Sequence, residues 1–219
     1  MCFEVCRSDV QDHRVVPETG DGNILFNRSR LMIGHFLMKP CGRILGCDMR
    51  TDIYNAETHG KIITDRGTIQ FEVFVHSVDM GIVVKTHTTS GERDFVWQWV
   101  SGSPNSPRYD KFKASGNTSK LVREYKENPP AVVDEKEKTA LFTYLNGGQT
   151  AVRWNISGKN SSQNLYITCA HSYPEHNALS LSEKYLDRIM CQSYSKLQKT
   201  HRKWWNQFYQ KSFVSLPDK

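Results

Sequence analysis

The chain has 219 residues and a formal net charge of +6, with 38% hydrophobic and 24% charged residues. This composition is typical of a globular protein with a sizeable core. It predicts no membrane-spanning helix, because no apolar run approaches the roughly 18 to 20 residues that a span needs. The charge is local, since residues 180–219 hold eight Lys and Arg against three acidic residues. This distribution favours the solvated face of one helix over a nucleic-acid surface.

Residues 1–22 show no regular pattern, so we define them only as an N-terminal segment. They lack the basic start and apolar core of a signal peptide, and the sequence therefore leaves the location of the chain open. From residue 23 to about 178, apolar residues alternate with polar ones between turn residues, which is typical of antiparallel strands. About ten strands are expected, at residues 23–27, 31–38, 47–56, 61–65, 68–76, 80–89, 94–100, 139–145, 149–156 and 164–171.

So many strands in one run predict a mainly β fold of two packed antiparallel sheets, a β-sandwich, because large twisted sheets curl or split. The clearest hairpin joins residues 68–76 to 80–89. On its first strand one face carries Ile69, Phe71, Val73 and Val75, and Phe74 breaks the alternation. Residues 101–128 are predicted to be an irregular segment. The sequence leaves open whether this segment is functional, mobile, an insertion or a crossing between the sheets.

A long amphipathic helix is predicted from Ser180 to about Lys211, within a linker segment that we define as residues 179–219. Its start is marked by Ser180 and Glu183, which have the spacing of a capping box. Apolar residues recur at three- and four-residue intervals and would share one face: Leu186, Ile189, Met190, Leu197, His201, Trp204 and Phe208. The helix would be roughly 45 Å long, so we expect part of this face to pack against a further domain.

Few residues suggest catalysis. The sequence has no nucleophile elbow, phosphate loop, dinucleotide fingerprint or zinc-protease motif, so we expect no cofactor. The six cysteines form no CxxC pair and are expected to be free thiols, without a structural metal. Carboxylates on or beside the strands are expected to be solvated rather than catalytic: Asp48, Asp52, Asp65 and Glu72.

Four residues are candidates for binding carbohydrate. Trp97 and Trp99 alternate with Gln98, so both rings fall on one face of a strand, where they could stack on sugar rings. A place in the core is the commoner role of such a pair. His76 lies near a hairpin tip and His171 precedes a turn, and both could orient a substrate hydroxyl.

Five segments resemble the N-terminal region of large bacterial glycoside hydrolases. They are residues 60–65 (Gly-Lys-Ile-Ile-Thr-Asp), 74–80 (Phe-Val-His-Ser-Val-Asp-Met), 147–152 (Gly-Gly-Gln-Thr-Ala-Val), 170–174 (Ala-His-Ser-Tyr-Pro) and, above all, 200–218 from Thr-His-Arg-Lys-Trp-Trp to Ser-Leu-Pro-Asp. Those enzymes join a β-supersandwich of the galactose-mutarotase-like type to an (α/α)6 barrel of the six-hairpin glycosidase class. The α-L-fucosidases of family 95 and the phosphorylases of family 65 share this layout.

The resemblance implies a noncatalytic sandwich domain whose partners are carbohydrate and a catalytic barrel in the same protein. The catalytic carboxylates of that class lie in the barrel, so no catalytic residue is carried over to this chain. A periplasmic or secreted parent is implied, with neither nucleic acid nor membrane as a partner. Two features depart from the family. The Pro-x-Gly-Asn-Gly-like strand expected before Asn23 is missing, and the 219 residues contain no barrel.

Two other hypotheses stay open. The chain could be a free-standing carbohydrate-binding module, in which Trp97 and Trp99 form the stacking platform. It could also bind nucleic acid or another anionic partner through the basic face of its C-terminal helix, in which case its affinity would fall steeply with salt. The sequence does not determine the sugar, the linkage, or whether the parent is a hydrolase or a phosphorylase.

Overall fold

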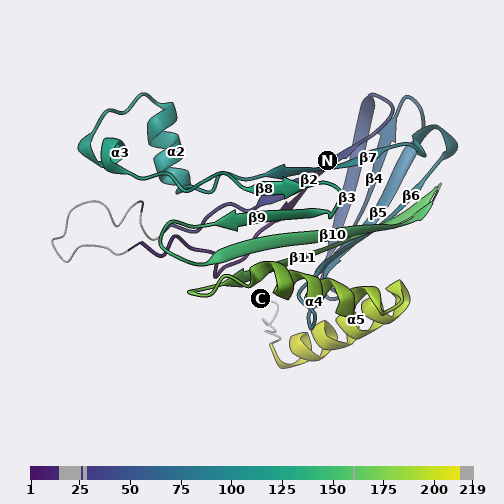
Figure 1. The fold of residues 1–219 in the computed structure, drawn as a ribbon. Coiled ribbons are helices and arrows are strands. Elements are labelled where there is room, and N and C mark those ends of the chain that lie inside the picture. Colours follow the sequence, from purple (N-terminus) through teal and green to yellow (C-terminus); the bar gives the residue numbers. More distant parts are fainter. Residues whose placement is uncertain (15–25, 27–28, 160, 213–219) are drawn as a thin grey trace, which may run out of the picture. The chain divides into compact units, whose positions relative to one another are not determined.

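The computed structural model describes residues 1–14, 26, 29–159 and 161–212 (Figure 1). In these residues it has eleven strands in two antiparallel sheets, followed by two C-terminal helices. The strands are hydrogen-bonded in the orders β1-β2-β7 and β3-β4-β5-β6-β11-β10-β9-β8. The predicted mainly β fold of two antiparallel sheets with a C-terminal helical segment is confirmed. The strand expected at 23–27 lies outside the described residues, except for Phe26.

The chain divides into two compact units that interleave along the sequence. Unit 1 consists of Met1–Lys39, Val96–Arg153 and Cys169–Ser182. Unit 2 consists of Pro40–Phe95, Trp154–Thr168 and Glu183–Lys219. The long strands β10 (Gln149–Lys159) and β11 (Ser162–Ser172) contribute residues to both units.

In unit 1 the N-terminal segment is more regular than predicted. Its first residues form β1 (Cys2–Val5), which pairs antiparallel with β2 (Gly34–Lys39), and β2 pairs in turn with β7 (Val96–Ser101). The short strand β8 (Val132–Asp134) pairs with β9 (Thr139–Thr143), and β9 pairs with β10. Both β1 and β8 escaped the sequence analysis because short edge strands carry little alternation.

The sequence had predicted that residues 101–128 are irregular, and this prediction is wrong for part of the segment. It contains the short helices α2 (Pro107–Ala114) and α3 (Lys120–Glu124). The rings of Tyr109 and Tyr125 stack with their centroids 4.0 Å apart. Pro107 occupies the first turn of α2, where a missing backbone N–H costs nothing, and it should have been recognised as a helix start.

Unit 2 is a meander of consecutive antiparallel strands, β3 (Ile44–Asp52), β4 (Glu57–Thr64), β5 (Thr68–Val75) and β6 (Ile82–Thr88), and β6 pairs with β11. The predicted hairpin is confirmed as β5 and β6. Gly60 lies opposite Phe71 in the ladder, and a Cβ at Gly60 would clash with the Phe71 ring. Glycine at this position therefore lets the ring lie against the β4 backbone.

The C-terminal segment forms two helices where one was predicted. α4 covers Ala178–Met190 and α5 covers Tyr194–Lys211 (Figure 1). Ser193 is the N-cap of α5, and its hydroxyl accepts a hydrogen bond from the Lys196 backbone N–H. Ser180 lies inside α4, where its hydroxyl donates to the Asn177 carbonyl, so the predicted capping box does not form. The apolar residues keep their helical spacing across residues 191–193, so the sequence pattern did not reveal the end of α4.

The two helices cover one end of the unit 2 sheet. Leu186 and Ile189 of α4 and Leu197 of α5 pack on Phe74, Val83 and Tyr166 of the strands. This contact explains Phe74, whose side chain points to the helices rather than to the face of Phe71. The predicted apolar helix face is therefore confirmed at Leu186, Ile189, Leu197 and the buried His201.

Met190, Trp204 and Phe208, which the pattern placed on the same face, are exposed in this chain, and their packing against a further domain stays a prediction. The last turns of α5 contact the turn between β3 and β4 through other side chains. Asn206 donates to the Tyr54 carbonyl at 3.0 Å, and Tyr209 stacks on the Tyr54 ring. Trp204 and Phe208 instead stack on each other, with ring centroids 5.5 Å apart. They form an exposed aromatic pair.

None of the helices in the described residues is both long and apolar enough to cross a membrane. All six cysteines are free thiols, and only Cys169 is buried.

Candidate functional site

The unit 2 sheet has a polar face that continues past the end covered by α4 and α5. Side chains two residues apart on a strand point to the same side, and the ladder places neighbouring strands in register. Two cross-strand rows result. The first row contains Asp48, Lys61, Gln70, His87 and Ser162, and the second contains Arg50, His59, Glu72 and Lys85.

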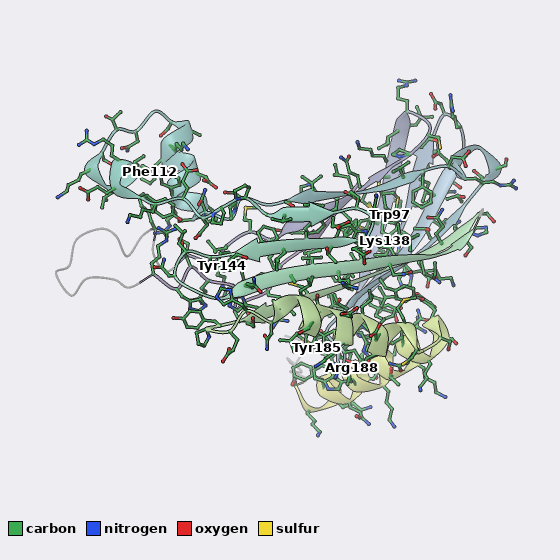
Figure 2. The ribbon with its side chains drawn as sticks, in the orientation of Figure 1. Trp97, Phe112, Lys138, Tyr144, Tyr185 and Arg188 are labelled. Atoms are coloured by element: carbon green, nitrogen blue, oxygen red, sulfur yellow. The ribbon has the colours of Figure 1, made fainter. Side chains whose placement is uncertain are left out.

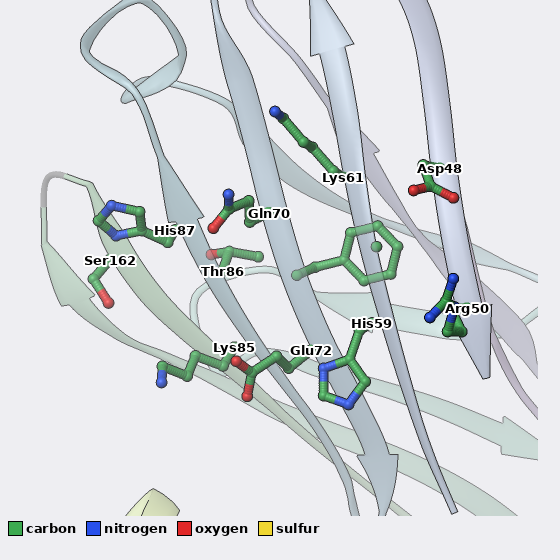
Figure 3. A pocket seen from close by; sticks show the side chains of 12 residues that line it. Asp48, Arg50, His59, Lys61, Gln70, Glu72, Lys85, Thr86, His87 and Ser162 are labelled. Carbon is green, nitrogen blue, oxygen red and sulfur yellow. The ribbon is translucent and has the colours of Figure 1, made fainter. Parts of the chain in front are cut away.

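These rows line a cavity of about 540 Å³. Figure 3 shows these side chains spread over the face of the adjacent strands. Gly60, Phe71 and Thr86 lie between the two rows and also line the cavity. Its size is within the range of ligand-binding sites, whereas its lining is far more polar than that of a typical apolar pocket.

The first residue of α5 contacts the second row. Tyr194 donates a hydrogen bond from its Oη to Glu72 Oε2 at 2.7 Å. The Lys85 ammonium lies 4.8 Å from the centroid of the Tyr194 ring. Burial, together with the neighbouring Glu72 carboxylate, raises the pKa of Tyr194, so its hydroxyl remains a donor at neutral pH. Helix α5 thereby fixes the orientation of Glu72.

An ion pair with a buried carboxylate and a partly exposed guanidinium joins α5 to β4 beside this polar face. Arg202 binds Glu57 with two parallel hydrogen bonds of 2.7 Å, and the Glu57 side chain is 1% exposed. Gln198 Nε2 and His59 Nε2 each lie 3.3 Å from Glu57 Oε2. The bidentate geometry fixes α5 against β4.

The four residues expected to bind carbohydrate are divided between the two units. Trp97, Trp99 and His171 belong to unit 1, and His76 belongs to unit 2. Trp99 is 6% exposed, packs against Phe36 and donates its indole N–H to Ser101 Oγ. Trp97 (Figure 2) is half-buried, with the Phe3 ring edge-on to it. Stacking on a sugar needs an exposed aromatic face, which Trp99 does not offer.

The two histidines lie in separate hydrogen-bond networks. His76 is 2% exposed, its Nε2 lies 2.9 Å from Thr200 Oγ1, and its Nδ1 accepts from the Asp79 backbone N–H. His171 Nδ1 lies 2.9 Å from Thr150 Oγ1, and its Nε2 lies 3.3 Å from His13 Nε2. The turn that contains His76 is thus tied to α5 rather than exposed at a hairpin tip.

Burial lowers the pKa of His76 and of His201, whose rings lie 6.3 Å apart. Unfolding raises both toward the ordinary value of about 6.5, so the unfolded chain binds more protons. The free energy of unfolding should therefore be fully retained above about pH 6.5 and fall below it, by up to about 1.4 kcal/mol per pH unit for each histidine. Urea unfolding between pH 7.5 and 5 measures this slope.

Two variants test which histidines cause the free energy of unfolding to fall as the pH is lowered. His76→Asn should make this slope shallower, whereas His176→Gln, which changes an exposed histidine, should leave it as in the unchanged chain. Equal slopes in all three proteins would refute the assignment to His76.

The sequence analysis missed most residues of the cavity. Of its lining it had considered only Asp48 and Glu72, and it had expected both to be solvated. One signal was present, because four strands each carry two polar residues at a spacing of two: Asp48 and Arg50, His59 and Lys61, Gln70 and Glu72, and Lys85 and His87. The register that aligns these pairs is not readable from the sequence.

Comparisons with known proteins indicate the fold alone. Neither a family model nor a curated protein matches the chain. Among solved structures, the chain is similar to a protein from the human microbiome with the provisional name kojibiose phosphorylase, at a TM-score of 0.50 and 12% sequence identity. The match covers 81% of this chain and 26% of that protein. The chain thus spans about a quarter of the length of the structure that it matches.

Proposed function

We propose that this chain is a noncatalytic β-sandwich domain of a carbohydrate-active enzyme that supports a helical catalytic domain of the same protein. The observation that carries the proposal is the structural match, because the two sheets and helices of this chain resemble one quarter of a protein named for glycoside phosphorolysis. Five sequence segments resemble bacterial glycoside hydrolases and support the same conclusion. The resemblance implies that the parent protein is a hydrolase or a phosphorylase.

The exposed aromatic pair also supports this proposal. Trp204 and Phe208 are 41% and 43% exposed and lie on the last turns of α5, beyond the turns that pack on the sheet through Leu197. An exposed pair of large stacked rings is unusual on a protein surface and favours a packing partner. The catalytic domain is the partner that we propose for it, and a periplasmic or secreted location of the whole enzyme belongs to the same proposal.

The native protein tests the proposal. An antibody raised against the 25.2 kDa chain should detect, in the source cells, a polypeptide well above that mass. After immunopurification this polypeptide should cleave glucosyl disaccharides by hydrolysis or, with phosphate added, by phosphorolysis. The recombinant 219-residue chain should release neither glucose nor glucose 1-phosphate in the same assays.

Two results would overturn the proposal. The first is a native polypeptide of the same mass as the recombinant chain and without glycoside turnover. The second is turnover by the recombinant chain that survives purification and is abolished by Glu72→Gln, since Glu72 is a carboxylate in the cavity.

A further inference from the structure

The unit 2 cavity contains more positive than negative charge that is free to meet a ligand. Arg50, Lys61 and Lys85 come from three different strands and all line it. In the described part of the chain, none of the three makes an ion pair within 4.0 Å. Asp48 lies opposite Lys61 and Glu72 lies opposite Lys85 in the ladder, so three cations share the cavity with two carboxylates.

The negative charges cancel part of this positive charge and leave a formal excess of one. The cavity contains two carboxylates, of Asp48 and Glu72, and two imidazoles, of His59 and His87. The Glu72 carboxylate already accepts the Tyr194 hydroxyl, which satisfies part of its hydrogen-bonding capacity and fixes its position. Arg50, Lys61 and Lys85 present hydrogen-bond donors from three strands around a space open to solvent.

We infer that this cavity binds an anionic saccharide, that is, a polyhydroxylated ring carrying a carboxylate or a phosphate. The three cations would hold the anionic group through charge-assisted hydrogen bonds. Gln70, His87 and Ser162 provide both donors and acceptors along the first row, as ring hydroxyls require. The anion part follows from the charges alone, whereas the saccharide part rests on the proposed function.

Other ligand classes fit the cavity less well. An apolar ligand would leave most of the polar lining without partners, which costs free energy for each group that is desolvated. A neutral sugar would bury the cations without balancing the excess positive charge. A nucleic acid would need the positive charge to extend along the surface, yet here carboxylates interrupt both rows.

Calorimetric titration of the full chain at low salt tests the inference with four probes, which are glucuronic acid, glucose 6-phosphate, glucose and inorganic phosphate. At least one charged sugar should bind more tightly than both glucose and inorganic phosphate, and added salt should weaken its binding. The tighter of the two charged sugars identifies the anionic group as a carboxylate or a phosphate.

Lys61→Gln and Lys85→Gln should each weaken binding of the charged sugar about tenfold, as expected for the loss of one hydrogen bond to a charged group. Lys61 is exposed, so its replacement tests the site without endangering the fold. Lys136→Gln, which removes an exposed lysine from the β8–β9 turn in unit 1, is the matched control and should bind as the unchanged chain does.

Three results would overturn the inference: no charged sugar binds more tightly than glucose, no charged sugar binds more tightly than inorganic phosphate, or none of the probes binds. Unchanged affinity in Lys61→Gln would refute the site itself. None of these results affects the mass or the turnover of the native protein. A failure of this inference is therefore distinguishable from a failure of the proposed function.

Discussion

Replacing Leu197 with Ala is expected to lower the free energy of unfolding by about 3 kcal/mol. Leu197 is 0% exposed and lies in the cluster that α4 and α5 form on β5, β6 and β11. Truncation of a buried leucine loses the transfer free energy of its methyl groups and leaves a cavity, for a total of about 2 to 5 kcal/mol. Urea unfolding followed by tryptophan fluorescence measures the change.

The matched control is Trp204→Ala on the same helix. The sequence pattern places Trp204 and Leu197 on one apolar face, whereas the structure buries Leu197 and leaves Trp204 41% exposed. Although Trp204 has the larger side chain, Trp204→Ala should therefore lower the free energy of unfolding by less than Leu197→Ala does, at most about 1 kcal/mol. Hydrogen exchange should accelerate along α5 in Leu197→Ala and not in Trp204→Ala. Equal destabilisation by the two substitutions would show that Trp204 belongs to the core.

Arg202→Ala is expected to lower the free energy of unfolding by about 2 kcal/mol. The substitution leaves the Glu57 carboxylate, 1% exposed, without its two hydrogen bonds from the guanidinium. Removing one partner of a fully buried pair costs about 3 to 5 kcal/mol. The Arg202 side chain is 42% exposed, and water can screen its charge and enter the site, so the smaller figure applies.

A double-mutant cycle separates the ion pair from the packing of the arginine stem. Glu57→Gln combined with Arg202→Ala should cost clearly less than the sum of the single substitutions, because no carboxylate is then left buried and unpaired. Lys203→Ala, at the exposed neighbouring position, should leave stability unchanged. Strict additivity of the two substitutions would mean that Arg202 and Glu57 contribute independently.

Sequence periodicity was most informative where a strand or helix has one buried face. The alternation at residues 68–76 and 80–89 predicted β5 and β6, since a strand with one covered face repeats every two residues. Phe74 broke that alternation, and the reason lies outside the strand. The helices cover only one end of the sheet, so the burial of this face changes along β5.

Helix continuity could not be read in the same way. Ser193 is a good N-cap, but it falls between apolar residues whose spacing fits one uninterrupted helix. The three residues between α4 and α5 interrupt the helix, but the three- and four-residue spacing of the apolar residues continues across them. The exposure of Trp204 and Phe208 follows from the contacts of α5 with Tyr54, far away in the sequence.

The sequence by itself determined the class of the fold, because turn residues and alternation are local properties of the chain. It also determined that four strands carry polar residues in pairs, at 48 and 50, 59 and 61, 70 and 72, and 85 and 87. Only the tertiary structure decided that these pairs align into two rows, since register depends on backbone hydrogen bonds between strands. It likewise decided that Tyr194 meets Glu72, because that contact needs the docking of α5 on the sheet.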